Sequence, residues 1–179
     1  MTQDENIWKF RAACMDGDVD LMYQICKEDP SFIAFENPDN LDFSILAKYW
    51  QIQFMSGTGD LDGVRRLVEN DPNLVNCQWT HERNTPLLQA TQIGAIEVFK
   101  YLIDKGADIS LTAMAEGQEG YSVLHAAAWW GNLEAAKILL ELGMDKNIRS
   151  AYWGTPLKIA TDRNRKEFAN YFLALGADI

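Results

Sequence analysis

The stretch Asn84-Thr-Pro-Leu-Leu-Gln-Ala-Thr-Gln-Ile-Gly94 decides the fold, because two later stretches of the chain repeat its pattern. Residues 121–131 and 154–164 fall into register with it when the chain is aligned on the residue that ends each stretch. An apolar, helix-forming segment follows each of the three, and two of these segments continue into Gly-Ala-Asp-Ile. Self-similarity of this kind predicts a stack of two-helix units.

The residues at the ends of these segments have a physical reason to be there. Thr85 and Thr155 can cap a helix by accepting a backbone N–H, and a proline follows each of them at the first helical position, where a missing N–H does no harm. Gly106, Gly143 and Gly176 suit the left-handed residue that closes a helix. The pattern therefore predicts both the helices and their boundaries.

Glycine spacing gives the length of the unit. Gly143 and Gly176 are 33 residues apart, whereas Gly106 and Gly143 are 37 residues apart. A repeat of two helices and a turn takes about 33 residues. The unit that ends at Gly143 is therefore longer by four residues, which we expect to lie within residues 110–120.

Thr-Pro-Leu, a pair of small residues, a glycine, an apolar helix and Gly-Ala-Asp together resemble the ankyrin repeat signature, and the match is specific in three units. The resemblance implies an all-α solenoid of about five stacked helix-turn-helix units with short β-turn or hairpin fingers. It covers residues 1–179 as a single domain. The approximate units are residues 5–40, 41–78, 79–114, 115–149 and 150–179.

The first two units depart from the signature. Residues 10–17 keep the helix, the small pair and the glycine but lack Thr-Pro, and we interpret this unit as a degenerate N-terminal cap. In the second unit the first helix begins near Leu41 and continues through Phe54, which makes it elongated. Its predicted apolar stripe has a helical period and comprises Phe43, Leu46, Ala47, Trp50 and Phe54.

Composition and charge exclude several classes of protein. No run of eighteen apolar residues exists, so no membrane span is expected, and the acidic N-terminus lacks the features of a secretory signal. We therefore expect a cytoplasmic protein with reduced cysteines. The net charge is −10, with nine acids against three bases in residues 1–40, and repulsion from phosphate argues against nucleic acid as a partner.

Catalysis and metal binding have little support in the sequence. Of the two histidines, His125 occupies the position at which the resemblance implies hydrogen bonds within and between repeats, and His81 has no second ligand at metal spacing. Cys14, Cys26 and Cys77 are an odd number without paired spacing. We predict no enzyme activity, no cofactor and no metal.

The remaining function is recognition, and the resemblance indicates where it would occur. The concave face of an ankyrin array is built from the turns between units and the exposed ends of the first helices. Aromatic side chains, which contribute strongly to protein interfaces, are concentrated there in units three to five. The candidate partner-binding residues are Trp129, Trp130, Tyr121, Tyr152, Trp153, Trp79, His81, Gln92, Ile93 and Arg163.

The first hypothesis is therefore a non-enzymatic module that binds a protein partner through this aromatic concave face, as an inhibitor, adaptor or targeting unit. Adjacent helical residues point about 100° apart, so one of the paired tryptophans Trp129 and Trp130 can pack beneath a neighbouring turn instead of facing the partner. Two alternatives remain: an aromatic pocket for a sugar or nucleotide, and self-association, the chain being a monomer or a weak homo-oligomer.

Overall fold

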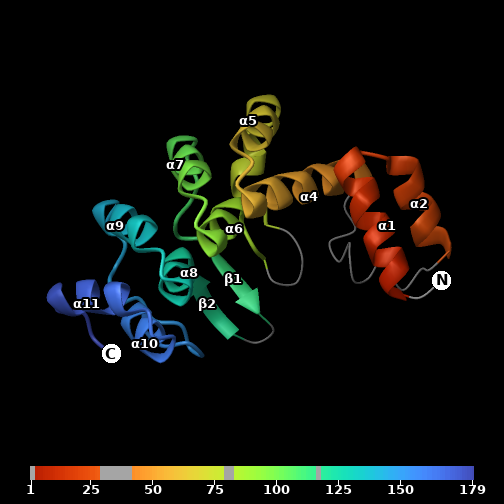
Figure 1. Cartoon of the computed structure of the whole chain (residues 1–179). Helices are drawn as coiled ribbons and strands as arrows, with labels where there is room; N and C mark the ends of the chain where they lie inside the picture. The colour runs from red at the N-terminus through yellow and green to blue at the C-terminus, as the bar shows by residue number, and fades with distance from the viewer. Residues whose placement is uncertain (1–2, 29–41, 79–82, 116–117) are drawn as a thin grey trace.

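A computed structural model describes residues 3–28, 42–78, 83–115 and 118–179. In this part of the chain the α-helices form five consecutive pairs (Figure 1). The first helices of the pairs are α1 (Gln3–Asp16), α4 (Phe43–Thr58), α6 (Pro86–Ile93), α8 (Val123–Trp130) and α10 (Pro156–Asp162). The second helices are α2 (Val19–Glu28), α5 (Leu61–Asn70), α7 (Ile96–Asp104), α9 (Leu133–Glu141) and α11 (Lys166–Ala174). A short 3-10 helix, η1 (Pro72–Asn76), follows α5.

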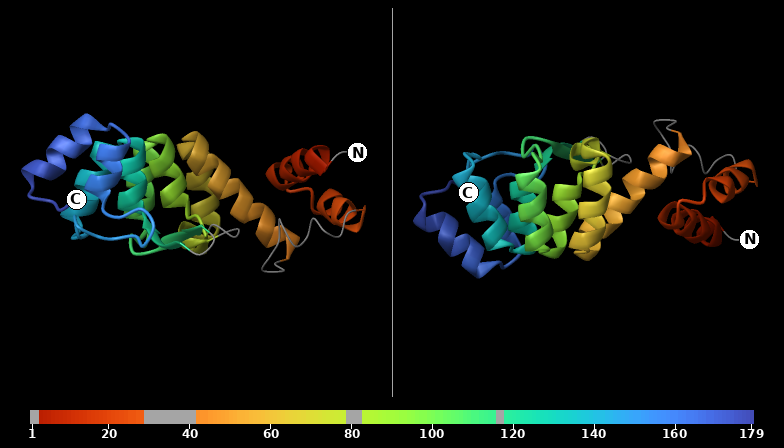
Figure 2. Two further views of the ribbon diagram at one scale, coloured as in Figure 1. Left: turned by 90° about the horizontal axis from the view of Figure 1, so that it is seen from below. Right: turned by 90° about the horizontal axis from the view of Figure 1, so that it is seen from above.

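The helix pairs stack in chain order. Helices α4, α6, α8 and α10 pack side by side as one layer, and α5, α7 and α9 follow one another in a second layer (Figure 2). Small residues allow the close approach of the first helices, since Ala126, Ala127 and Ala128 of α8 are completely buried. The predicted all-α ankyrin-type solenoid is confirmed.

The predicted helix caps are confirmed. The hydroxyls of Thr85 and Thr155 accept hydrogen bonds from the backbone N–H groups of Leu88 and Lys158, each at 3.2 Å. Glycines with positive φ end α6 and α8, whereas α10 is followed at the equivalent place by Asn164, with φ of 55°. Asparagine is one of the few residues besides glycine that tolerates this conformation.

Helix α4 is elongated, as predicted: it has 16 residues, whereas α6 and α8 have eight. Its two halves belong to different hydrophobic clusters. Leu46 is buried among residues of α1 and α2, whereas Ile52 is buried in the cluster shared by the later units. Because the buried face changes along the helix, the predicted single stripe is wrong at its end, and Phe54 is exposed.

The four extra residues belong to a β-hairpin. Strand β1 (Thr112–Ala115) pairs with β2 (Gln118–Ser122) in antiparallel fashion, with Thr112 opposite Ser122 and Ala113 opposite Tyr121. An isolated bridge between Ser150 and Gly154 forms the corresponding finger of the next unit. Both fingers lie directly before the first helix of their unit.

His125 links two consecutive units, as predicted. Its Nδ1 lies 3.1 Å from the backbone nitrogen and 2.7 Å from the hydroxyl of Ser122, and its Nε2 lies 3.0 Å from the carbonyl oxygen of Gly154. Gln53 of α4 makes the equivalent link between units two and three, donating to the carbonyl oxygen of Asn84 at 2.9 Å. Asn84 and Gly154 each precede a Thr-Pro dipeptide, so the two side chains satisfy the same carbonyl of the repeat.

Candidate binding surface

The paired tryptophans of α8 have different environments. Trp129 is partly buried and packs against the main hydrophobic cluster. Trp130 is 50% exposed. The two side chains therefore differ in their accessibility: Trp129 is packed against its neighbours, whereas Trp130 is accessible to a partner.

Trp129 is one of four side chains that we call the aromatic cluster, which comprises Tyr121, Trp129, Tyr152 and Trp153. Trp153 is at its centre. Its ring centroid lies 4.7 Å from that of Trp129, 4.7 Å from that of Tyr152 and 6.2 Å from that of Tyr121, with interplanar angles of 84°, 80° and 65°. Edge-to-face contacts of this kind stabilise a structure beyond the burial of apolar area, so the rings support one another.

The geometry of α8 and the fingers explains how distant residues meet in the aromatic cluster. Tyr121 comes from β2 and Trp153 from the finger before α10, whereas Trp129 lies near the end of α8. Helical side chains point back toward the N-terminus of their helix. The Trp129 ring is thereby directed along α8 toward the finger side chains.

Two arginines of the last unit hold Trp129 from the other side. The Arg163 guanidinium carbon lies 3.0 Å from the centre of the Trp129 ring. The Nε of Arg165 donates to the carbonyl oxygen of Trp129 at 2.9 Å, which satisfies an acceptor at the end of α8. The indole and its backbone are thus fixed by two cations of the next unit.

Tyr121 presents its phenol beside this cation. Burial raises the pKa of Tyr121 above its ordinary value, and the positive charge of Arg163 partly offsets that rise. Its ring stacks on that of His125, with centroids 5.9 Å apart. Within the part of the chain that the structure describes, the Tyr121 hydroxyl makes no hydrogen bond, so it can donate one to a partner.

Ile93, Trp130 and Arg163 occupy the same repeat position in units three, four and five, directly before the residue with positive φ that follows each first helix. We call them the terminal row. Ile93 is 52% exposed and Arg163 is also exposed, while Gln92, one residue before Ile93, is partly buried. The terminal row therefore places apolar, aromatic and cationic side chains along consecutive units.

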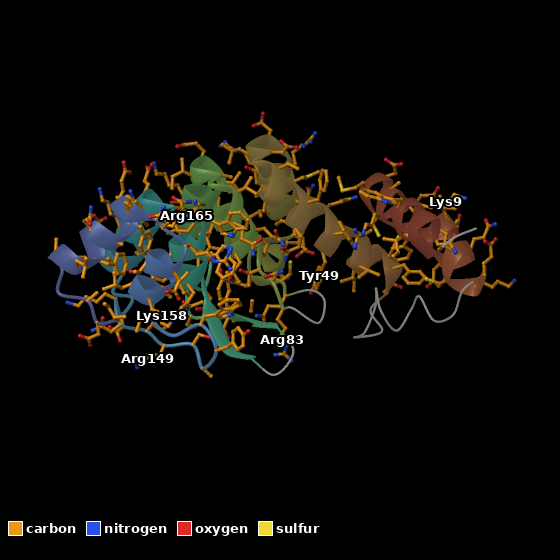
Figure 3. The ribbon with its side chains drawn as sticks, turned by 60° about the horizontal axis from the view of Figure 1, so that its bottom comes forward. Lys9, Tyr49, Arg83, Arg149, Lys158 and Arg165 are labelled. Atoms are coloured by element: carbon orange, nitrogen blue, oxygen red, sulfur yellow. The ribbon has the colours of Figure 1, made fainter. Side chains whose placement is uncertain are left out.

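Further charges lie at the finger edge. Arg83 and Arg149 are exposed and lie toward the lower edge of the array in Figure 3, whereas Arg165 lies farther up among the helices. Lys158 on α10 is paired with Asp162, at 2.5 Å between nitrogen and oxygen. Two further sequence candidates, Trp79 and His81, lie outside the described residues.

The described residues give little support for other kinds of site. In the described ranges no three His, Cys, Asp or Glu side chains are grouped so that they could hold a metal ion. Among the same residues no helix combines the length and the hydropathy needed to cross a membrane. The three cysteines are buried, and none forms a disulfide with another cysteine of the described residues.

The repeat geometry agrees with a direct comparison of the sequence with known families. Residues 52–150 match the family model described as ankyrin repeats in three copies. The chain belongs to the ankyrin repeat family. The match begins within α4 and ends at the finger before α10, and the last helix pair continues the same stacking beyond it. Ankyrin repeats are typically non-catalytic modules for protein–protein interaction.

Curated relatives are similar over parts of the chain. Alpha-latrotoxin-Lg1a of Latrodectus geometricus is 34% identical over 88 residues, which are 49% of this chain and 6% of the toxin. The E3 ubiquitin-protein ligase Ufd4 of Drosophila melanogaster is 36% identical over 104 residues, 58% of this chain and 4% of the ligase. Human protein phosphatase 1 regulatory subunit 27 is 41% identical over 59 residues, 33% of this chain and 38% of that protein.

The chain thus spans a small fraction of the length of the first two of these relatives. Sequence reasoning missed two residues that organise the array. Arg165 is not among the candidates named from the sequence, although it follows the residue that closes α10 and its Nε reaches the carbonyl oxygen of Trp129 near the end of α8. Gln53 takes the place of a histidine, and its alignment with His125 on Gly59 and Gly131 is the signal that could have identified it.

Proposed function

We propose that the ankyrin repeats of this chain bind a protein partner through the concave surface formed by the aromatic cluster and the terminal row. The observation that carries the proposal is the contrast between rigid and exposed aromatics on one surface. Trp129 and Trp153 are partly buried against the core, whereas Trp130 and Tyr152 are 50% and 64% exposed. The Trp153 ring holds the exposed Tyr152 ring in edge-to-face contact before any partner arrives.

Such a surface is more stable when a protein partner covers it than when it is exposed to water. Covering a half-exposed tryptophan contributes about 1–3 kcal/mol, and tryptophan, tyrosine and arginine are the residues that most often dominate interface energies. Because Trp129 and Trp153 lose no further side-chain freedom on binding, the entropic cost is lower than for mobile aromatics. The role of the complex, whether inhibition, adaptation or targeting, depends on which protein is bound.

The experiment is affinity capture with the full chain immobilised, followed by a binding titration of the captured protein. Replacing Trp130 and Tyr152 together by alanine should weaken binding at least tenfold, which is about 1.4 kcal/mol. Trp8 of α1 is 70% exposed and lies in the first unit, so Trp8→Ala is a matched control of the same chemistry. Equal binding by the Trp130/Tyr152 variant and the wild-type chain would refute the proposal.

A further inference from the structure

The guanidinium of Arg163 is oriented, but its charge is not neutralised. Its central carbon lies 3.0 Å from the centre of the Trp129 ring, and the N–H groups of a guanidinium lie in its plane, where they can bind a planar acceptor. Within the described residues Arg163 makes no ion pair, and the neighbouring Asp162 is already paired with Lys158. Arg163 is therefore an exposed cation that lies against an indole ring and has no acidic partner among the described residues.

Apolar side chains continue the terminal row on one side of Arg163. Trp130 lies in the preceding unit and Ile93 in the unit before that, each about half exposed. The spacing is that of the stacked first helices, because the three residues share one repeat position. A segment that crosses these units would meet an apolar, an aromatic and a cationic side chain in turn.

The positive charge of Arg163 determines which side chains of a partner can bind beside it. A lysine or arginine of a partner would have to displace Arg163 from the indole face of Trp129, because that face is already covered by a cation. A carboxylate instead gains a charge-assisted hydrogen bond, bidentate where the geometry allows. Repulsion of an acidic segment is also weakest around Trp130 and Arg163: residues 121–179 carry seven bases and six acids, although the whole chain has a net charge of −10.

We infer that the terminal row receives a partner segment in which an aspartate or glutamate lies beside apolar side chains. The carboxylate binds the Arg163 guanidinium, and the apolar side chains cover Trp130 and Ile93. This inference rests on the proposed function and adds the chemistry of the partner to it. Sedimentation at several concentrations shows whether the acidic first forty residues of a second copy of this chain supply such a segment.

The test uses short random peptides displayed on phage and selected on the immobilised full chain at physiological salt. The selected peptides should be enriched in Asp or Glu next to apolar residues. A synthetic copy of the most enriched peptide is then titrated by fluorescence anisotropy, together with a version in which each acid is replaced by its amide. The amide version should bind at least tenfold more weakly.

Variants of Arg163 identify the site. Arg163→Met keeps an unbranched side chain over the indole of Trp129 without the charge, and should weaken the acidic peptide at least tenfold while leaving the amide version unchanged. Arg66 of α5 is also exposed, so Arg66→Met is the matched control and should bind like the wild-type chain. Circular dichroism and melting temperature verify that both variants fold.

The outcomes separate this inference from the proposed function. Selection of peptides without acidic enrichment, failure to select any peptide, or equal affinity of Arg163→Met and wild type each overturns the inference. If Trp130→Ala still weakens the selected peptide in these cases or in partner capture, the surface assignment survives and only the acidic chemistry is wrong. If neither variant changes binding of any ligand, both proposals fail.

Discussion

The Arg163 guanidinium lies on the face of the Trp129 ring, 3.0 Å from its centre, and so joins the last unit of the array to the unit before it. The same indole is in edge-to-face contact with Trp153. Trp129 is thus enclosed by side chains of the following unit, although it belongs to the surface that we assign to a partner. Its main contribution is expected in stability, and that of Trp130 in binding.

Trp129→Ala should lower the free energy of unfolding by about 2–4 kcal/mol, because it removes a partly buried indole together with its contacts to Trp153 and Arg163. Trp130→Ala removes a half-exposed side chain and should change it by less than about 1 kcal/mol. Urea denaturation followed by circular dichroism measures both. Similar losses for the two variants would contradict the different environments that the structure gives them.

His125 between Ser122 and Gly154 predicts a dependence of stability on pH. A carbonyl oxygen only accepts and a backbone N–H only donates, so Nε2 carries the proton and donates to Gly154, while Nδ1 accepts from Ser122. Protonation of Nδ1 would oppose the Ser122 N–H. Burial lowers the pKa of His125 below its ordinary value, and the hydrogen bond to Gly154 offsets this only in part.

The sign follows from proton linkage. With a lowered pKa the folded protein binds fewer protons than the unfolded chain, so stability is complete above the unfolded pKa near 6.5. It should fall as the pH drops below about 6.5 toward the folded pKa. His125→Leu, which copies Leu88 of unit three, should lose this part of the pH dependence. It should also cost about 1–3 kcal/mol at neutral pH, because the Gly154 carbonyl and the Ser122 N–H lose their partner.

Urea denaturation of wild type and His125→Leu at neutral and at acidic pH gives the comparison. The other histidine, His81, is present in both proteins, so its titration cancels. A wild-type stability that falls no more steeply than that of the variant would show that His125 does not titrate as its hydrogen bonds require.

Gln53 is expected to matter as much as His125, although it lacks the histidine's signature. Its side-chain nitrogen donates to Asn84 at 2.9 Å and lies 3.4 Å from the carbonyl oxygen of Cys77, and the side chain is 6% exposed. Gln53→Leu leaves these carbonyls without the donor and should lower the free energy of unfolding by about 1–3 kcal/mol. Gln53→His should recover part of the loss, because Nε2–H can reach the same acceptor. Thermal denaturation of the two variants checks the order, and a Leu variant as stable as the His variant would contradict it.

The sequence was sufficient for the repeats because each boundary residue has a local chemical reason. Thr85 and Pro86 favour the start of a helix through local backbone interactions alone, and Gly94 favours its end in the same way. Trp129 could not be placed in the same way, since its exposure depends on Trp153 and Arg163, which are more than twenty residues away and meet it only after stacking. Phe54 was misplaced for a related reason: the face that α4 buries changes where its neighbours change.

The reactivity of the three cysteines can reveal the order in which the two hydrophobic clusters unfold. Cys14 and Cys26 are buried in the cluster formed by α1, α2 and the first half of α4, whereas Cys77 is buried in the larger cluster of the later units. Burial raises the pKa of the Cys77 thiol from 9.0 to about 12, so the native protein holds it as an unreactive thiol at neutral pH. Reaction of any of the three therefore requires local or global opening.

We expect a maleimide at mildly alkaline pH to modify Cys14 and Cys26 before Cys77, because the first cluster buries fewer apolar side chains among the described residues and should open at a lower free energy. Mass spectrometry of proteolytic fragments, taken at successive times, assigns each modified thiol. Leu46→Ala, which weakens only the first cluster, should accelerate Cys14 and Cys26 and leave Cys77 unchanged. Simultaneous modification of all three in wild type and variant would mean that the five helix pairs open as one cooperative unit.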